Sequence, residues 1–229
     1  SGILPLPQFP KQCPKDKNGV PQYMKQIAIM AIRDNPKKKL KTSDDIIMLN
    51  KQFDGKNLQW QVPEGKWIIL RFVCSNTGQH LIVPSPNSNG LQIDFLDPKA
   101  TTRYLQHILN RLRITKQNAK TSGLSYLSFD SMELDEATTW TDAMDSIFMA
   151  HHGYDILPHL PAFVGWELPG GNDLFLQQYK KTVSDQLIFS HYTTGRDFLA
   201  EYGIQLNAEA GGPGPPLWKS CPVEALKAL

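Results

Sequence analysis

Two groups of carboxylates are the residues of this sequence best suited to acid–base chemistry. Four acids fall within seven positions, Asp130, Glu133, Asp135 and Glu136, directly after the apolar segment 124–129. Closely spaced carboxylates repel one another, which raises the pKa of one of them or favours an oxygen-coordinated cation such as Ca²⁺. The alternative is a solvent-exposed acidic loop that only caps a helix.

Glu209 ends a second apolar segment, 204–209, and precedes a Gly-rich loop. An unpaired carboxylate is costly to bury, so we expect Glu209 at the edge of a sheet, near a ligand or a cation. Glu133 and Glu209 would then be two carboxylates at one edge, as in enzymes that hydrolyse glycosidic bonds. Trp140 and Trp218 lie close in sequence to these acids and are candidates for stacking on a sugar, with a core role as the alternative.

The residues before the first carboxylate group have the pattern of strands. Between about residues 20 and 95, short β-branched segments alternate with turns, which predicts a small antiparallel β-domain. Its strands are expected at Gln26–Arg33, Ile46–Leu49 and Lys66–Cys74. Residues 1–20 are rich in Pro and Lys and are expected to form an extended arm.

From Asp97 onwards, helical and strand patterns alternate. Asp97 is a good N-cap and Pro98 suits the first helical position. A strand is expected at 124–130, a helix that ends at Gly153, a long helix from about 172 to 203 with a bend or a break, and a strand at 204–209. This order predicts a parallel sheet, and both strands end in a carboxylate, as the strands of a (β/α)₈ barrel do at a catalytic edge.

The predicted fold class is therefore α/β, with two regions. Residues 1–95 form an N-terminal arm and a β-rich, sandwich-like domain, and residues 96–229 form a partial (β/α)₈, TIM-type barrel. A complete barrel needs roughly 200–250 residues, so the barrel is expected to be truncated at the C-terminus of this chain.

Composition and charge exclude several classes of protein. The net charge is +2, but residues 1–60 carry 11 Lys and Arg against 5 Asp and Glu, and the remainder is acidic. The acidic remainder argues against a nucleic-acid surface. No apolar run approaches the roughly 20 residues of a membrane span, and the first residues lack the pattern of a signal peptide. Cys13, Cys74 and Cys221 have no metal-ligand spacing.

Six segments, taken in order, resemble the α-L-rhamnosidases of glycoside hydrolase family 106. They are PEGKWIILRF at 63–72, TG at 77–78, GLQID at 90–94, FDSME at 129–133, GYDILPHLP at 153–161 and NAEAGGPG at 207–214. The resemblance implies a (β/α)₈ catalytic barrel elaborated with β-domains, inversion at the anomeric carbon and the use of two glutamates. It also implies calcium at the active site of some members.

Residue by residue, the resemblance implies that Glu133, in the Asp-Ser-x-Glu motif, is the general base. Asp130 becomes a candidate for contact with the sugar or with calcium, and Glu209 a further substrate-site carboxylate. Met132 departs from the motif, because many relatives carry Trp there. The general acid is expected on a strand beyond Leu229, so we expect this chain alone to lack part of the catalytic machinery.

The predicted function is that of an inverting α-L-rhamnosidase acting on a plant or complex polysaccharide. The expected partner is a rhamnose-containing glycan, and the resemblance implies a secreted or periplasmic location. Three alternatives stay open: a non-catalytic carbohydrate-binding module, a retaining glycosidase that uses Glu133 and Glu209, and a structural domain. The pattern leaves the linkage, the aglycone and the oligomeric state undetermined.

Overall fold

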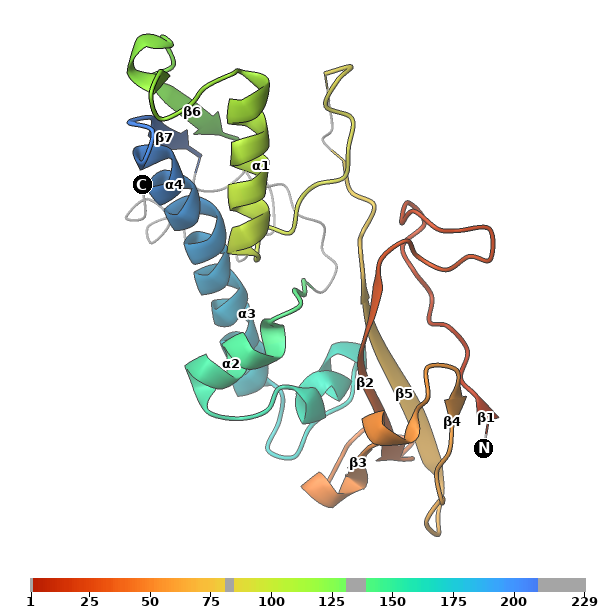
Figure 1. Ribbon diagram of the computed structural model, residues 1–229. Coiled ribbons are helices and arrows are strands. Elements are labelled where there is room, and N and C mark those ends of the chain that lie inside the picture. The colour runs from red at the N-terminus through yellow and green to blue at the C-terminus, as the bar shows by residue number, and fades with distance from the viewer. Residues whose placement is uncertain (1, 81–84, 131–138, 210–229) are drawn as a thin grey trace. The chain divides into compact units, whose positions relative to one another are not determined.

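The computed structural model describes residues 2–80, 85–130 and 139–209. Over these residues the chain is a mixed α/β protein with small sheets and four α-helices (Figure 1). It divides into two compact units, one made of Ser1–Gln92 and Ala143–Gln177, the other of Ile93–Asp142 and Gln178–Leu229. Within the described ranges, no helix combines the length and the apolar character needed to cross a membrane.

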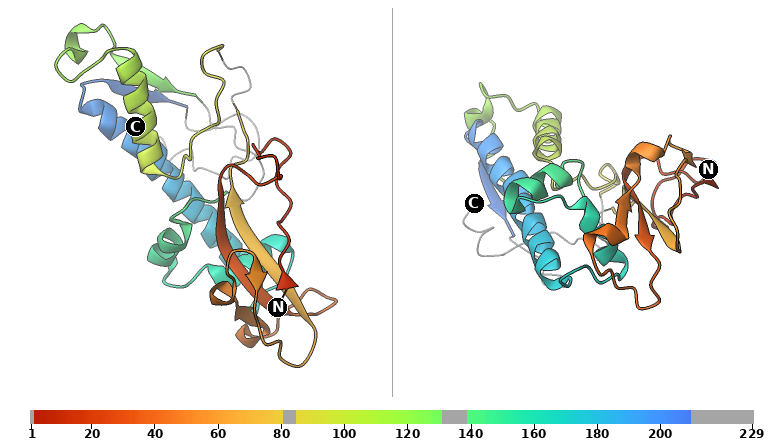
Figure 2. Two further views of the ribbon diagram at one scale, coloured as in Figure 1. Left: turned by 45° about the vertical axis from the view of Figure 1, so that its right-hand side comes forward. Right: turned by 90° about the horizontal axis from the view of Figure 1, so that it is seen from below.

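A three-stranded antiparallel sheet organises the first unit (Figure 2). Its strand order is β3–β2–β5, with β2 at Met24–Arg33, β3 at Ile46–Met48 and β5 at Trp67–Ser75. Residues 28 to 32 of β2 are fully buried, so both faces of the central strand are covered. The three strands predicted from the apolar, β-branched segments are confirmed, with bounds that differ by one or two residues.

Shorter elements complete the β-rich part of this unit. Strand β1 at Gly2–Ile3 pairs with β4 at Asn57–Leu58, and 3₁₀ turns lie at Ser43–Asp45 and Asn50–Gln52. Side chains from β2 and from the following segments form one apolar cluster that includes Ile29, Ala31, Leu49, Leu58, Trp60 and Trp67. The cluster gives the small sheet a core of its own.

Residues 143–177 belong to the same unit and are helical. Helix α2 at Met144–His152 ends at Gly153, whose φ of 77° is the left-handed conformation that glycine adopts at a helix end. A 3₁₀ helix follows at Leu157–Val164 and ends in the same way at Gly165. The end of the first helix at Gly153 is thus as the sequence predicted.

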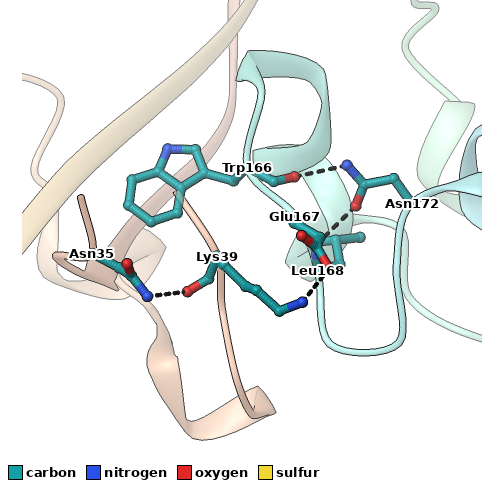
Figure 3. Close-up of polar contacts among 6 residues, drawn as sticks. All are labelled: Asn35, Lys39, Trp166, Glu167, Leu168 and Asn172. Atoms are coloured by element: carbon teal, nitrogen blue, oxygen red, sulfur yellow. Dashed lines mark hydrogen bonds and ion pairs between the residues drawn. The ribbon is translucent and has the colours of Figure 1, made fainter. Parts of the chain in front are cut away.

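Main-chain hydrogen bonds and an ion pair join this segment to the chain between β2 and β3, and Figure 3 shows the ion pair of Lys39 with Glu167. The amide of Leu40 donates to the carbonyl of Glu167 at 2.9 Å, and the amide of Glu167 donates to Lys38 at 2.8 Å. The Lys39 ammonium lies 2.5 Å from the Glu167 carboxylate. The Asn172 amide group then fixes the adjacent turn, because it donates to the carbonyl of Trp166 at 2.8 Å and accepts from the amide of residue 168 at 2.9 Å.

The second unit contains a parallel pair of strands covered by helices. Strand β6 at Tyr126–Phe129 pairs in parallel with β7 at Gln205–Ala208. Helix α1 at Pro98–Arg111 begins as predicted, with the Asp97 carboxylate accepting from the amide of Lys99 at 2.9 Å, and a 3₁₀ turn lies at Ala119–Thr121. One apolar cluster packs α1, helix α4 at Thr194–Ala200 and both strands together, and it includes Leu105, Leu109, Leu127, Leu199 and Leu206.

The long helix predicted between residues 172 and 203 changes its pitch. Helix α3 spans Asp173–Leu187, a π-helical turn, η5, spans Ile188–Thr193, and α4 continues from Thr194 to Ala200. The sequence predicted a bend or a break here, and the structure instead has a continuous helix whose pitch widens at the π-helical turn. The boundary between the two units falls within α3.

The grouping of residues differs from the domains drawn from the sequence. Residues 143–177 group with the β-rich segment, because main-chain bonds tie them to residues 38–40. The sequence pattern had assigned every residue after 95 to the barrel region. Two paired parallel strands agree with a β/α arrangement, and the division at residue 95 and the barrel itself stay predictions.

The hydrogen bonds of the Asn172 side chain, shown in Figure 3, can be tested by substitution. Replacing Asn172 by Ala leaves a carbonyl at Trp166 and an amide at Leu168 without partners, and both residues are only 3% exposed. We expect local stability to fall by about 1–3 kcal/mol. The measurement is hydrogen exchange of the amides at 165–169, whose rate should rise by roughly tenfold or more.

The matched control for this change is Asn110→Ala. The Asn110 side chain is exposed and accepts only from Gln106 of the same helix, at 3.0 Å. Its loss should cost no more than about 0.5 kcal/mol. Equal effects of the two substitutions on hydrogen exchange at 165–169 would contradict the proposed role of the Asn172 side chain in holding this turn.

Candidate functional site

The register of the parallel strands brings two acidic residues to one edge. Phe129 is paired with Ala208 at the last position of the ladder, so Asp130 and Glu209 are the next residue of each strand. The amide of Glu209 still donates to the carbonyl of Phe129, at 3.1 Å. Both acidic residues are exposed, so their carboxylates are open to solvent and to a ligand.

The sequence-predicted site residues differ in how far they can be located. Asp130 and Glu209 lie side by side along the strand ends, and Trp140 is half-buried in the same unit. Glu133 and Trp218 lie outside the described residues. The roles assigned to all five stay predictions.

Hydrogen bonds on either side of Trp140 fix its place in the second unit. The Tyr179 hydroxyl donates to the carbonyl of Thr139. The Thr141 hydroxyl donates to the carboxylate of Asp94 at 2.6 Å. The main chain on both sides of Trp140 is held in this way, and its partly exposed ring is suited to stacking on a sugar.

Asp94 is an acidic residue of this unit that the sequence analysis did not select as a site residue. One carboxylate oxygen accepts from Thr141 and the other accepts from the amide of Leu96 at 2.9 Å. Desolvation by the surrounding chain raises the pKa of the Asp94 carboxyl, and repulsion from Asp97 and Asp142 adds to the rise. A carboxyl with a raised pKa is of a kind found in acid–base sites, and Asp94 ends the GLQID segment quoted above.

His191 lies in the π-helical turn and packs directly beneath the end of β6. Its ring stacks on Phe129, with 4.4 Å between the ring centroids, and meets Phe95 edge-on at 5.0 Å. The side chain is 7% exposed, and among the described residues its Nδ1 has no hydrogen-bond partner. Desolvation lowers the pKa of the imidazole to about 4, so the ring is neutral at pH 7.

Tyr192, the next residue, contacts the end of β7. The residue is fully buried, and its hydroxyl donates to the carbonyl of Glu209 at 3.0 Å. Burial raises the pKa of the phenol to about 12. The hydroxyl therefore keeps its proton, and stays a donor, throughout the neutral pH range.

Gly195 allows α4 to pack closely against the same strand end. A Cβ at this position would lie 2.8 Å from a ring carbon of Phe129. That distance is shorter than a carbon–carbon contact allows, so only glycine fits here without moving Phe129.

The sequence held weak signals for these additional residues. His191 and Tyr192 match the apolar face of a long helix. The contacts of the two side chains depend on the π-helical turn. The contact of His191 also depends on Phe129, which lies more than 60 positions earlier in the sequence. A helical pattern does not contain that information.

The exposed Asp130 and Glu209 can accept hydrogen bonds from the hydroxyls of a polar ligand, and a carboxyl with a raised pKa, such as that of Asp94, can move protons. Among the residues for which coordinates are described, no three His, Cys, Asp or Glu side chains gather in a way that could hold a metal ion. The described part of the site is thus suited to acid–base chemistry on a polar ligand.

Comparison with known proteins gives consistent matches. The family model described as alpha-L-rhamnosidase matches residues 14–219. A protein of Formosa agariphila named "Putative beta-glucuronidase" is 29% identical over 162 residues, which are 68% of this chain and 14% of that protein. The rhamnosidase structure from Novosphingobium sp. PP1Y is 29% identical with a TM-score of 0.62, and the match covers 73% of this chain and 17% of that one. The matched part of this chain therefore corresponds to about one-seventh to one-sixth of the length of these relatives.

The burial of His191 predicts a pH dependence of stability. The folded-state pKa of about 4 is below the ordinary imidazole pKa of 6.5, so between these values the unfolded chain binds more protons than the folded chain. The neutral ring contributes to stability fully above pH 6.5. As the pH falls towards 4, this contribution is lost and the free energy of unfolding decreases by about 3 kcal/mol.

We expect His191→Phe, which keeps an aromatic ring in this place, to remove that part of the pH dependence. The measurement is the free energy of unfolding in urea between pH 4.5 and 7.5. A smaller slope of the same sign should remain from His159, because burial lowers its pKa as well. An unchanged slope in His191→Phe would show that His191 titrates in the folded chain as it does in the unfolded one.

Proposed function

We propose that the full-length protein hydrolyses an α-L-rhamnosidic bond. The premise is that this chain belongs to the alpha-L-rhamnosidase family, glycoside hydrolase family 106. The proposal is supported by one observation above others. The parallel pairing of β6 and β7 brings Asp130 and Glu209 to the same strand edge, next to each other. Hydrolysis of a glycosidic bond needs carboxyl groups arranged around one sugar.

Glu133 is proposed as the general base. It follows Asp130 by three residues in the sequence, and β6 ends at Phe129. In an inverting reaction its carboxylate takes a proton from water while the water attacks the anomeric carbon. A second carboxyl, roughly 6.5–9.5 Å away, protonates the leaving oxygen, and the oxygen–carbon bond breaks.

The other site residues have supporting roles in this proposal. Asp130 and Glu209 accept hydrogen bonds from sugar hydroxyls, and Trp140 and Trp218 stack on the apolar faces of the substrate. The general acid is proposed to lie in a part of the full-length protein other than this chain. The proposed barrel would supply further strand ends for it.

Hydrolysis of aryl glycosides by the full-length protein tests the activity and the substrate class. We expect release of nitrophenol from the α-L-rhamnoside and little from the β-D-glucuronide, the substrate type named for the Formosa relative. Proton NMR of the first product then distinguishes inversion from retention. Retention would favour Glu133 and Glu209 as acid/base and nucleophile, with carboxyls about 5–5.5 Å apart.

A third result is also informative. Binding of rhamnose-containing oligosaccharide without hydrolysis by the full-length protein would contradict the enzymatic proposal and favour a carbohydrate-binding module. The proposed partner in every case is a rhamnose-containing glycan of a plant or complex polysaccharide. A secreted or periplasmic location is proposed with it.

Glu133→Gln tests the general base. The amide cannot accept the proton from water, so kcat on the aryl rhamnoside should fall by about 10²–10⁴-fold in the full-length protein. The control is Glu201→Gln, the same chemical change at an exposed glutamate that pairs with Lys116 at 2.6 Å. The control should retain activity, and wild-type turnover in Glu133→Gln would rule out this base.

Calcium at this site is proposed with Asp130 as one ligand. The described carboxylates do not form a metal-binding group by themselves, so no step above is assigned to the ion. We expect treatment of the full-length protein with EDTA to lower its activity and its melting temperature, and added Ca²⁺ to restore both. Asp130→Asn should require more Ca²⁺ for the same recovery. Full activity after chelation would contradict the proposal.

A further inference from the structure

The π-helical turn η5 contacts both strand ends of the candidate site. A turn of this kind contains one extra residue per turn and often occurs at functional sites. Here three consecutive residues of the turn are buried: Ser190, His191 and Tyr192 are 0%, 7% and 0% exposed. Each of the three has a different contact outside the helix.

The contacts of these three residues lead to three connected parts of the unit. The Ser190 hydroxyl donates to the carbonyl of Phe95 at 2.6 Å, and the His191 ring stacks on Phe129 at the end of β6. The Tyr192 hydroxyl donates to the carbonyl of Glu209, just after β7. One turn of helix thus supports the segment after Asp94 and the two strand ends that carry acidic residues.

The contact at Glu209 completes the restraint of its main chain. The amide on one side of the Glu209 Cα atom donates to Phe129 at 3.1 Å, and the carbonyl on the other side accepts from Tyr192 at 3.0 Å. Both peptide groups that flank the Cα atom are therefore held. Glu209 has left the strand and is exposed, yet the direction in which its side chain leaves the backbone is fixed.

Tyr192 is well suited to this contact. A buried phenol must find a hydrogen-bond partner, and here the partner is the main chain of the site. Two rings of the same layer, Phe129 and His191, stack with an interplanar angle of 21° and limit movement on the β6 side. A well-packed support of this kind holds a ligand-binding group more precisely than a free loop would.

We propose that Tyr192 is a positioning residue for Glu209: its hydroxyl, presented by the π-helical turn, holds the Glu209 main chain so that the carboxylate meets the substrate. The inference deepens the proposed function and rests on it for the statement that Glu209 contacts the sugar. The restraint itself does not depend on which ligand the site takes.

Tyr192→Phe in the full-length protein removes only the hydroxyl group, and Tyr202→Phe is its matched control. Tyr202 lies in the same unit, is 9% exposed, and its hydroxyl also makes one hydrogen bond, to Gln106 at 3.1 Å. Both variants lose a buried hydroxyl, so a general loss of stability should be alike in the two. An effect specific to Tyr192→Phe then reports the contact with Glu209.

The first measurement is kcat/KM on the aryl rhamnoside. We expect Tyr192→Phe to lower it by roughly 10- to 100-fold and Tyr202→Phe to leave it within about threefold of wild type. In a background of Glu209→Gln, Tyr192→Phe should have little further effect, because it acts through Glu209. Equal effects of the two tyrosine variants, or full additivity with Glu209→Gln, would overturn the proposal.

The second measurement does not require activity. Hydrogen exchange of the amides at 205–209 should be faster in Tyr192→Phe by roughly two- to tenfold, as expected for one lost hydrogen bond, and unchanged in Tyr202→Phe. If wild-type protein hydrolyses no glycoside, the proposed function fails, and the exchange result still decides the restraint. Unchanged exchange in Tyr192→Phe would overturn the inference with or without activity.

Discussion

The parallel hydrogen bonding of two short strands is the constraint on which the candidate site depends. Parallel strands present their carboxyl ends at one edge, so the residues that follow them become neighbours although nearly 80 positions separate them in the sequence. A shift of one residue in the pairing would move the side chains of β7 to the opposite face of the sheet. Apolar packing by α1 and α4 against Leu127 and Leu206 prevents that shift, because it buries one face of each strand.

Support for the strand ends comes from a helix that is irregular where it meets them. A continuous α-helix repeats every 3.6 residues and turns successive side chains away from one another. The π-helical turn instead accommodates Ser190, His191 and Tyr192 as consecutive buried residues. Gly195 one turn later lets the helix approach Phe129 closely. The cost is a buried imidazole that stays neutral, with its Nδ1 lacking a partner among the described residues.

The first unit follows a different principle, because its core includes five fully buried residues, 28 to 32, of a central strand with an antiparallel neighbour on each side. Its helical segment comes from later in the chain and is tied to residues 38–40 by main-chain hydrogen bonds. The chain therefore builds two compact units from interleaved segments. The chain belongs to the alpha-L-rhamnosidase family, and its match covers 17% of the length of the Novosphingobium rhamnosidase.

Local patterns in the sequence were sufficient for the elements and for the residues that end them. The apolar segment of β2, the Asp97–Pro98 start of α1 and the glycine that ends α2 act within a few residues, so composition and spacing reveal them. The same patterns predicted that two strands end in Asp130 and Glu209, which directly follow β6 and β7 in the structure. Only the tertiary structure decided that residues 143–177 join the β-rich unit, that Asp94 pairs with Thr141, and that Tyr192 holds Glu209. These contacts join distant positions, and their energies depend on burial and on a change of helical pitch that no local pattern records.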